Sequence, residues 1–297
     1  MPPFDFGDGS DATVLRVLWS FAETSGLLRK CSTKKILSAF DVGFNVQFDP
    51  DERRFRQRLM YVALDDVGCV FYDDYPIEPA DTLVGLSLEA ASYLSFPAQI
   101  AVLDALYSPY FQSLTADSST SIVGTHREKA ISRTKAICDE VSLVREIYLP
   151  RRDNCTVGLI GVSRFQAQVL AEQGFSIRVW DRDPGYIGQE ILPGVFVRST
   201  ESSEEQLSGI DIALISGMTI GNNTLPTILS EARRLGVKTV CWAVTGSKLA
   251  PIYRDAGLTS AICEGFPPYF LPGETTLSVF RDKAFGRLAG GQNRPSR

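Results

Sequence analysis

The stretch TVGLIGVSRFQ, residues 156–166, begins like the phosphate-binding turn of a dinucleotide-binding domain. Such a turn uses three glycines: one bends the chain, one lets a diphosphate approach the backbone, and one allows the helix to pack closely on the strand. Gly161 supplies the bend, but Ser163 and Gln166 occupy the other two positions. We therefore expect backbone N–H groups after Gly161, with Ser163 as helix N-cap, that attract a small anion more readily than a complete dinucleotide.

An acidic residue, Asp181, ends the next predicted strand, 20 residues after Gly161 (181 − 161). In the dinucleotide-binding fold an acidic side chain at this distance holds a ribose hydroxyl. Asp181 with Arg182 and Asp183 equally fits the start of a solvated turn before a Pro-Gly pair. The sequence leaves both roles of Asp181 open.

Two later loops carry glycines and polar side chains at the ends of predicted strands. ISGMTIGNNTL follows the strand that ends at Ser216, and AVTGSKLAP follows the strand that ends near Val244. Ligands of open α/β sheets bind beyond the carboxyl ends of the strands, so we expect both loops to converge near Gly161. The candidate ligand-binding residues in them are Gly217, Thr219, Asn222, Asn223, Thr224, Thr245, Gly246 and Ser247. Asn223, Thr224 and Ser247 equally suit helix caps.

A metal centre or a standard catalytic triad has little support. The single histidine, His126, stands apart, and the six cysteines are widely spaced without a C-x-x-C pair, so we expect buried thiols. A hard, oxygen-ligated ion at Asp73, Asp74 or Glu89 is the alternative, and His126 as a general acid or base is another. The sequence has no P-loop, nucleophile elbow or kinase signature, which disfavours hydrolases and phosphotransferases of those types.

The second half of the chain reads as a doubly wound α/β domain. Short runs that are apolar on both faces alternate with helical segments, a pattern typical of a mostly parallel sheet covered by helices. The predicted strands are TVGLIG, SIRVWD, VFVR, DIALISG, VKTVCWAV and SAICE. The predicted helices run from Arg164 to Gln173, Leu225 to Leu235 and Leu249 to Ala256, and a last amphipathic segment runs from Glu274 to Leu288.

The first half is predicted to be a smaller α+β domain. A helix from about Asp11 to Cys31 precedes strands at VGFNVQFD, RLMYVALDD and CVFYDD, and helices follow at PAQIAVLDALYSPYF and from about Glu128 to Arg145. LPRRDNC then combines a proline with consecutive charges, which suits an exposed connection. We therefore place the domains at 1–150 and 151–297.

Composition limits the partners. The net charge of −5 and the pI near 5.1 argue against binding to nucleic acid or to an anionic membrane surface. The longest apolar runs are strand-sized, far below the roughly 20 residues that span a bilayer. The segment MPPFDFGDGSD lacks the features of a secretory signal, so a cytoplasmic location is expected. Small molecules or protein surfaces are the expected partners.

The two loops after Ser216 and Val244, within GIDIALISGMTIGNNTLPTILSEAR and VCWAVTGSKLAPIYRDAGLTSAIC, resemble those of the heavy-metal chelation family. VGFNVQFD and LVGLSLEAASYLSFPAQIAVLDALYS in the first half resemble the same family, so the resemblance covers about Leu37 to Leu277. It implies an enolase-N-terminal-like domain followed by a Rossmann-like domain of unassigned function. It also implies a metal ligand and an interdomain cleft formed by Gly161, Gly217, Thr219, Asn223 and Gly246 opposite the segment near Gly85.

Three functions follow as hypotheses. The first is a protein that binds a small anionic or metal-chelating metabolite between its domains, as an accessory enzyme of a specialised biosynthetic pathway. The second is an enzyme dependent on NAD(P) or S-adenosylmethionine, with Asp181 on the ribose. The third is a non-catalytic dimeric scaffold. A homodimer is expected in each case, and the identity of the cofactor stays open between a metal ion and these nucleotides.

Overall fold

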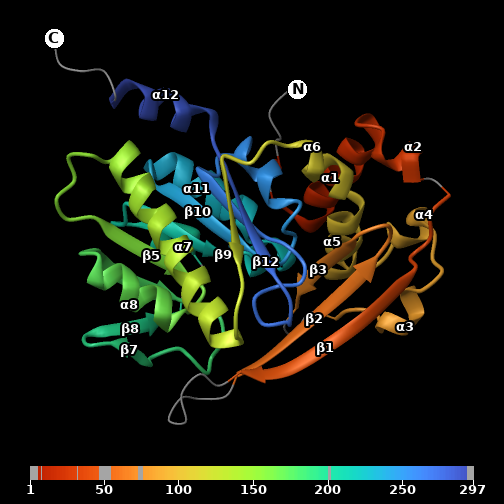
Figure 1. Ribbon diagram of the computed structural model, residues 1–297, viewed down its shortest axis with the longest axis horizontal. Helices are drawn as coiled ribbons and strands as arrows, with labels where there is room; N and C mark the ends of the chain where they lie inside the picture. The colour runs from red at the N-terminus through yellow and green to blue at the C-terminus, as the bar shows by residue number, and fades with distance from the viewer. Residues whose placement is uncertain are drawn as a thin grey trace.

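Two sheets organise the molecule (Figure 1). The computed structural model describes residues 6–7, 9–31, 33–46, 55–72, 76–199 and 202–292. Within these ranges the strands form a three-stranded antiparallel sheet near the N-terminus and a nine-stranded, mostly parallel sheet after it. The predicted α/β fold with a smaller N-terminal α+β part is therefore confirmed.

The N-terminal part packs helices on one face of its small sheet. Its elements are α1 (Asp11–Thr24), α2 (Leu27–Cys31), β1 (Ser38–Val46), β2 (Phe55–Ala63), β3 (Val67–Phe71), α3 (Ala80–Leu83), α4 (Leu88–Ala91), α5 (Phe96–Leu106) and α6 (Ser108–Ser113). Every residue of α5 is buried. Gly68 lets β3 touch α5, since a Cβ at Gly68 would lie 2.0 Å from the carbonyl oxygen of Ala101. The small sheet and α5 thus form one closely packed layer pair.

The large sheet has the strand order β4-β12-β11-β10-β9-β5-β6-β8-β7. These strands are β4 (Ser118–Ile122), β5 (Thr156–Ile160), β6 (Ser176–Trp180), β7 (Glu190–Leu192), β8 (Val195–Arg198), β9 (Ile212–Ser216), β10 (Lys238–Ala243), β11 (Ser260–Glu264) and β12 (Thr275–Arg281). The six strands from β11 to β8 are parallel. The direction of winding reverses between β5 and β9, as in dinucleotide-binding folds, so this is where a ligand crevice is expected.

Helices cover both faces of the large sheet. They are α7 (His126–Tyr148), α8 (Arg164–Glu172), α9 (Ser203–Leu207), α10 (Met218–Gly221), α11 (Leu225–Leu235), the 3-10 helix η1 (Ala250–Arg254) and α12 (Lys283–Gln292). Alternate strand residues point to opposite faces. Ile212 and Leu214 of β9 lie in the core under α7 and α8, whereas Ala213 and Ile215 lie in a second core. That second core continues into α1 and α5, so the two sheets share it.

Some segments differ from the predicted arrangement. The segment Glu274 to Leu288, expected to be one amphipathic unit, forms β12 and the start of α12, and β12 runs antiparallel to both β11 and β4. Residues 118–148, which precede the boundary expected at residue 150, supply β4 and α7 to the large sheet. Four of the five residues of β4 are exposed, so this strand lacks the apolar alternation that would reveal it.

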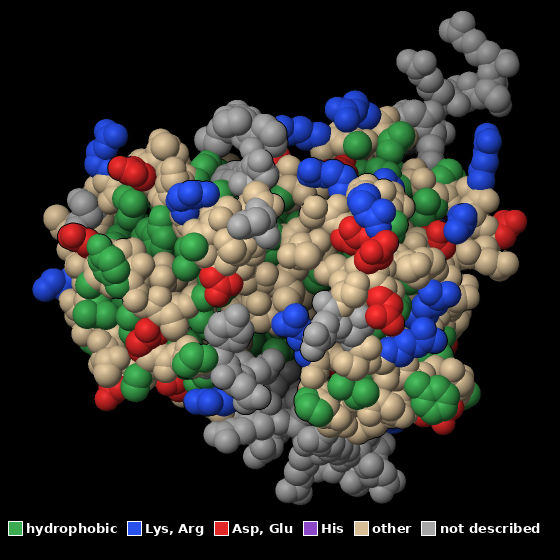
Figure 2. All heavy atoms as spheres, turned by 180° about the vertical axis from the view of Figure 1, so that it is seen from behind, with side chains coloured by type: hydrophobic (Ala, Val, Ile, Leu, Met, Phe, Trp, Pro, Cys, Tyr) green, Lys and Arg blue, Asp and Glu red, His purple; other side chains and the backbone are tan. Residues whose placement is uncertain are grey.

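The surface agrees with the composition. On the face shown in Figure 2, the described basic side chains are interspersed with acidic ones rather than gathered over one region. Among the described residues, no helix combines the length and apolar character needed to cross a membrane.

Candidate functional site

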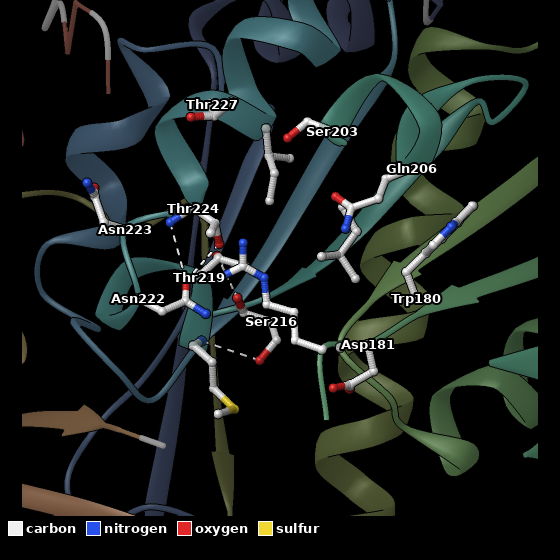
Figure 3. A pocket seen from close by; sticks show the side chains of 15 residues that line it. Trp180, Asp181, Ser203, Gln206, Ser216, Thr219, Asn222, Asn223, Thr224 and Thr227 are labelled. Atoms are coloured by element: carbon white, nitrogen blue, oxygen red, sulfur yellow. Dashed lines mark hydrogen bonds between the residues drawn. The ribbon is translucent and has the colours of Figure 1, made fainter. Parts of the chain in front are cut away.

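A cavity of about 270 Å³ opens at the carboxyl ends of β5, β6 and β9, where the winding of the sheet reverses. We call it the switch-point cavity. It is lined by Ile160, Gly161, Trp180, Asp181, Arg182, Ser203, Gln206, Ser216, Met218, Thr219, Asn222, Asn223, Thr224, Thr227 and Ile228. Figure 3 shows Ser203 and Gln206 reaching toward the space, with Asp181 and Ser216 on facing sides. Ligands of open α/β sheets bind at such points, so this cavity is the candidate site.

The turn after β5 retains the bend of a phosphate-binding loop. Gly161 has φ +100°, and its N–H donates to the carbonyl of Trp180 at 2.9 Å. Ser163 is the N-cap of α8, and its Oγ accepts the N–H of Gln166 at 3.4 Å. Gln166, at the third glycine position, is 1% exposed, and neither polar atom of its amide has a hydrogen-bond partner. The two substituted glycine positions are therefore filled by a capping side chain and a buried one.

Asp181 links the turn to the cavity. Its Oδ2 accepts the N–H of Val162 at 2.7 Å, and its Oδ1 accepts the N–H of Asp183 at 2.8 Å. Burial raises the pKa of the Asp181 carboxyl, and these backbone hydrogen bonds counteract the rise. Asp181 thus both lines the cavity and forms the turn before Pro184, so the geometry accommodates the two roles left open by the sequence.

Three lining side chains are available to a ligand. Within the described part of the chain, the side chains of Arg182, Ser203 and Gln206 take part in no hydrogen bond or ion pair. The loop after β9 is instead held by its own bonds: Thr219 Oγ1 donates to Ser216 O at 2.7 Å, and Asn222 Oδ1 accepts from Thr224. The cavity therefore combines a loop held by internal hydrogen bonds with three side chains that can form hydrogen bonds to a ligand.

Asn223 connects the rim of the cavity to the N-terminal segment. Its φ of +57° is a left-handed conformation that asparagine tolerates better than most residues. Its Nδ2 donates to Gly9 O and to Asp11 Oδ1, both at 2.7 Å. Its side chain lies apart from the other labelled ones (Figure 3), and its Oδ1 is buried without a hydrogen bond. Asn223 thus anchors α1 beside the site.

The loop after β10 contacts the small sheet. Thr245 Oγ1 accepts the N–H of Phe71 at 2.9 Å, and the N–H of Gly246 donates to Cys69 O at 3.0 Å. We call this contact between β3 and the β10 loop the seam. Asp104 strengthens the seam by accepting the N–H groups of Cys69 at 3.0 Å and Lys248 at 2.7 Å.

A second cavity lies in the seam, but its volume of about 10 Å³ is close to the least that holds one water molecule. Its lining includes Ser247 and Tyr61, whose buried hydroxyl has no hydrogen-bond partner. Among the described residues, the interdomain region expected to hold a ligand is closed at this point.

The predicted site residues therefore fall into two groups. Gly161, Asp181, Thr219, Asn222, Asn223 and Thr224 line the switch-point cavity. Ser163 caps the adjacent helix, and Gly217 packs against β10, where a Cβ would lie 2.6 Å from Ala243 Cα. Thr245, Gly246 and Ser247 lie at the seam. Gly85 lies between α3 and α4 and lines neither cavity.

Sequence reasoning missed nine lining residues, which come from the ends of β5, β6 and β9, from the turn after β6, and from the helices α9, α10 and α11. They are Ile160, Trp180, Arg182, Ser203, Gln206, Ser216, Met218, Thr227 and Ile228. One signal was available for α9: Ser202 and Glu205 have the spacing of a helix start, and Ser202 Oγ accepts the N–H of Glu205 at 3.3 Å. The position of α9 over the sheet could not be read from that signal.

The described residues do not fit a heavy-metal site. Among them no three His, Cys, Asp or Glu side chains cluster. All six cysteines are buried, and burial raises the pKa of Cys138 and Cys241 to about 12, which disfavours metal-binding thiolates. His126 begins α7 beside Tyr269, and Glu89 is exposed on α4. Asp73 and Asp74 lie outside the described residues.

Comparisons with known proteins agree with the fold. Residues 144–240 match the model of DUF364, a family described as "Putative heavy-metal chelation". A DUF364 protein of unknown function from Desulfitobacterium hafniense is similar in structure, with a TM-score of 0.51, 13% identity, and coverage of 89% of this chain and 98% of the other. A DUF364 protein of unknown function from Pyrococcus horikoshii gives a TM-score of 0.53, 12% identity, and coverage of 89% and 99%. No curated protein matches the sequence.

These findings confirm the resemblance seen in the sequence. Residues 144–240, which run from the end of α7 to β10, carry the family's pattern. The fold of nearly the whole chain is shared with two solved members of that family. Residues 144–240 thus resemble the DUF364 family in sequence pattern, and the chain resembles two solved members of that family in fold.

Proposed function

We propose that this chain binds a small polar metabolite in the switch-point cavity. The observation that carries the proposal is the position of the cavity at the carboxyl ends of β5, β6 and β9, where the winding reverses. Its volume of about 270 Å³ lies just below the range of about 300–1,000 Å³ for drug-sized ligands, so a compact compound suits it. A role as an accessory enzyme in a biosynthetic pathway is part of the same proposal.

The lining favours an organic ligand over a bare metal ion. Hydroxyl and amide groups of Ser203 and Gln206 offer hydrogen bonds, Arg182 offers a positive charge, and Asp181 supplies a carboxylate. A heavy metal would need several soft or charged ligands close together, and the described residues contain no such group. Dialysis against EDTA is therefore expected to leave ligand binding unchanged, whereas loss of binding would show that a metal ion takes part.

A cavity-filling substitution tests the proposal. Small molecules that co-purify with the protein are identified by mass spectrometry, and their binding is measured by calorimetry. Ser203→Phe is expected to weaken that binding at least about tenfold, because the ring occupies the space, equivalent to about 1.4 kcal/mol. Ser113→Phe, on the exposed end of α6, is the matched control and should bind like the wild type. Equal affinity of wild type and Ser203→Phe would refute the proposed site.

An enzyme that uses an adenosine cofactor, NAD(P) or S-adenosylmethionine, is the second candidate. Asp181 favours it, because this carboxylate directly follows β6 beside the cavity, where a ribose hydroxyl is held in dinucleotide-binding folds. The candidate predicts saturable binding of one of these nucleotides. Absence of such binding in calorimetry would eliminate it.

The assembly and location of the chain are also proposals. We propose a cytoplasmic homodimer, and sedimentation of the purified protein at the mass of one chain would contradict the dimer. If the protein is instead a dimeric scaffold without a ligand, Ser203→Phe should leave its function intact, and only substitutions at the subunit interface should abolish it.

A further inference from the structure

The two halves of the large sheet end in different surroundings. In a dinucleotide-binding fold each half takes one mononucleotide, and the two meet at the switch point. Here the carboxyl ends of β5 and β6 in the first half, and that of β9 at the start of the second half, open into the switch-point cavity. Beyond β9, the second half sends its β10 loop into the seam instead. The halves are therefore not equally open to a ligand.

Protein occupies the position of a second nucleotide. The N–H of Phe71 donates to Thr245 Oγ1, and Gly246 donates to Cys69 O, both across the seam. A Cβ on Gly221 would lie 2.8 Å from Phe71 O, so the small sheet touches the loop after β9 as well. The seam cavity has space for about one water molecule. A ligand that fills the first half cannot extend past β10.

The Asp181 carboxylate occupies the position that a diphosphate would need. The N–H of Val162 follows the Gly161 bend and would face a phosphate in a complete turn, but it donates to Asp181 Oδ2 at 2.7 Å. A phosphate oxygen there would lose this donor and would lie beside a carboxylate of like charge. Ser163 and Gln166 add side chains where the fold needs glycine. Asp181 thus serves as an internal anion of the turn.

The open half has the chemistry of a nucleoside site. A carboxylate has about four acceptor positions, and backbone N–H groups of Val162, Asp183 and Arg182 use three of those of Asp181. The remaining position can accept a ribose 2′-hydroxyl, the hydroxyl that an acidic residue holds at this point of dinucleotide-binding folds. Trp180 and Ile228 supply apolar surface for a planar ring, and the amide of Gln206 can bond to a base edge. We infer that the switch-point cavity takes a ligand with one ribonucleoside and no diphosphate, an inference that rests on the proposed function.

A matched set of nucleosides tests the inference by calorimetry. Adenosine, guanosine, cytidine and uridine are titrated first, and then the 2′-deoxynucleoside and the 5′-diphosphate of any that binds, together with NAD+. We expect at least one ribonucleoside to bind, and its 2′-deoxy form to bind about tenfold more weakly, because a hydrogen bond to a carboxylate is lost. The diphosphate and NAD+ are expected to bind more weakly than the nucleoside.

The variant Asp181→Asn should also weaken nucleoside binding about tenfold, since the charge is removed. Asp183→Asn is its control, because Asp183 does not line the cavity. The deoxynucleoside comparison uses wild-type protein, so it holds even if Asp181→Asn fails to fold. Tighter binding of the diphosphate or of NAD+, equal binding of the 2′-deoxy form, or no binding of the four nucleosides would overturn the inference. If no nucleoside binds but another metabolite binds the wild type and binds Ser203→Phe more weakly, the proposed function still stands.

Discussion

Gly161 holds a backbone conformation that its neighbours reinforce. Its φ of +100° strains any residue with a side chain, and a Cβ there would lie 2.8 Å from Ser216 Cβ. Gly174 has a similar φ of +86°, but nothing lies within 4 Å of the position of its missing Cβ. A side chain at position 174 would meet backbone strain alone, whereas a side chain at position 161 would meet backbone strain and a close contact with Ser216.

We expect Gly161→Ala to lower the free energy of unfolding by on the order of 1–3 kcal/mol more than Gly174→Ala does, because of that contact. Chemical denaturation of both variants measures the difference. If both variants lose the same free energy of unfolding, Ser216 moves away without cost and its contact does not restrain the bend at Gly161.

At the scale of elements, α8 packs against α7, β6 and β7 and carries a polar side chain where the fold usually has glycine. Gln166 is 1% exposed, and both polar atoms of its amide lack a hydrogen-bond partner. Unsatisfied buried amides oppose folding. We expect Gln166→Met, which keeps the volume, to raise the free energy of unfolding by about 1–2 kcal/mol. Thermal and chemical denaturation test this, with Gln168→Met on the exposed side of α8 as control. A loss of stability in Gln166→Met would indicate that the amide bonds to a group such as a buried water.

For the molecule as a whole, the seam and the shared core join the two sheets, so we expect them to unfold as one cooperative unit. Thr245→Val removes the acceptor of the buried Phe71 N–H and should cost about 1–3 kcal/mol. We expect calorimetry to show one unfolding transition that moves to lower temperature. Thr276→Val, on an exposed position of β12, is the control and should leave the transition in place. Two separate transitions, one for each sheet, would contradict this coupling.

The sequence predicted the central parallel strands well because β5 and β9 carry nearly continuous apolar runs. TVGLIG and DIALISG became β5 and β9. The outer strand β4 could not be recognised in this way, because its exposed serines and threonine pair only after a distant segment, β12, has folded beside it. Non-local pairing of this kind leaves no local periodicity in the chain.

The candidate site was predictable in part for a similar reason. Gly161 and Asp181 follow strands, and their place at the sheet edge follows from the winding. Ser203 and Gln206 enter the cavity from α9, whose position depends on its packing against β5 and α11. Thr245 and Gly246 also follow the carboxyl end of a parallel strand, as Gly161 and Asp181 do, yet the small sheet covers them. The residues of the loop after β10 do not by themselves predict this contact with the small sheet.

Trp180 gives the molecule a built-in optical reporter. The chain has three tryptophans, and this one is 2% exposed and lines the switch-point cavity. Trp19 donates its indole N–H to Gln99, and Trp242 lies under Arg133, so both have fixed surroundings away from the cavity. A compound that enters the cavity changes the polarity around the Trp180 ring, and emission intensity can then follow its arrival in real time without a label.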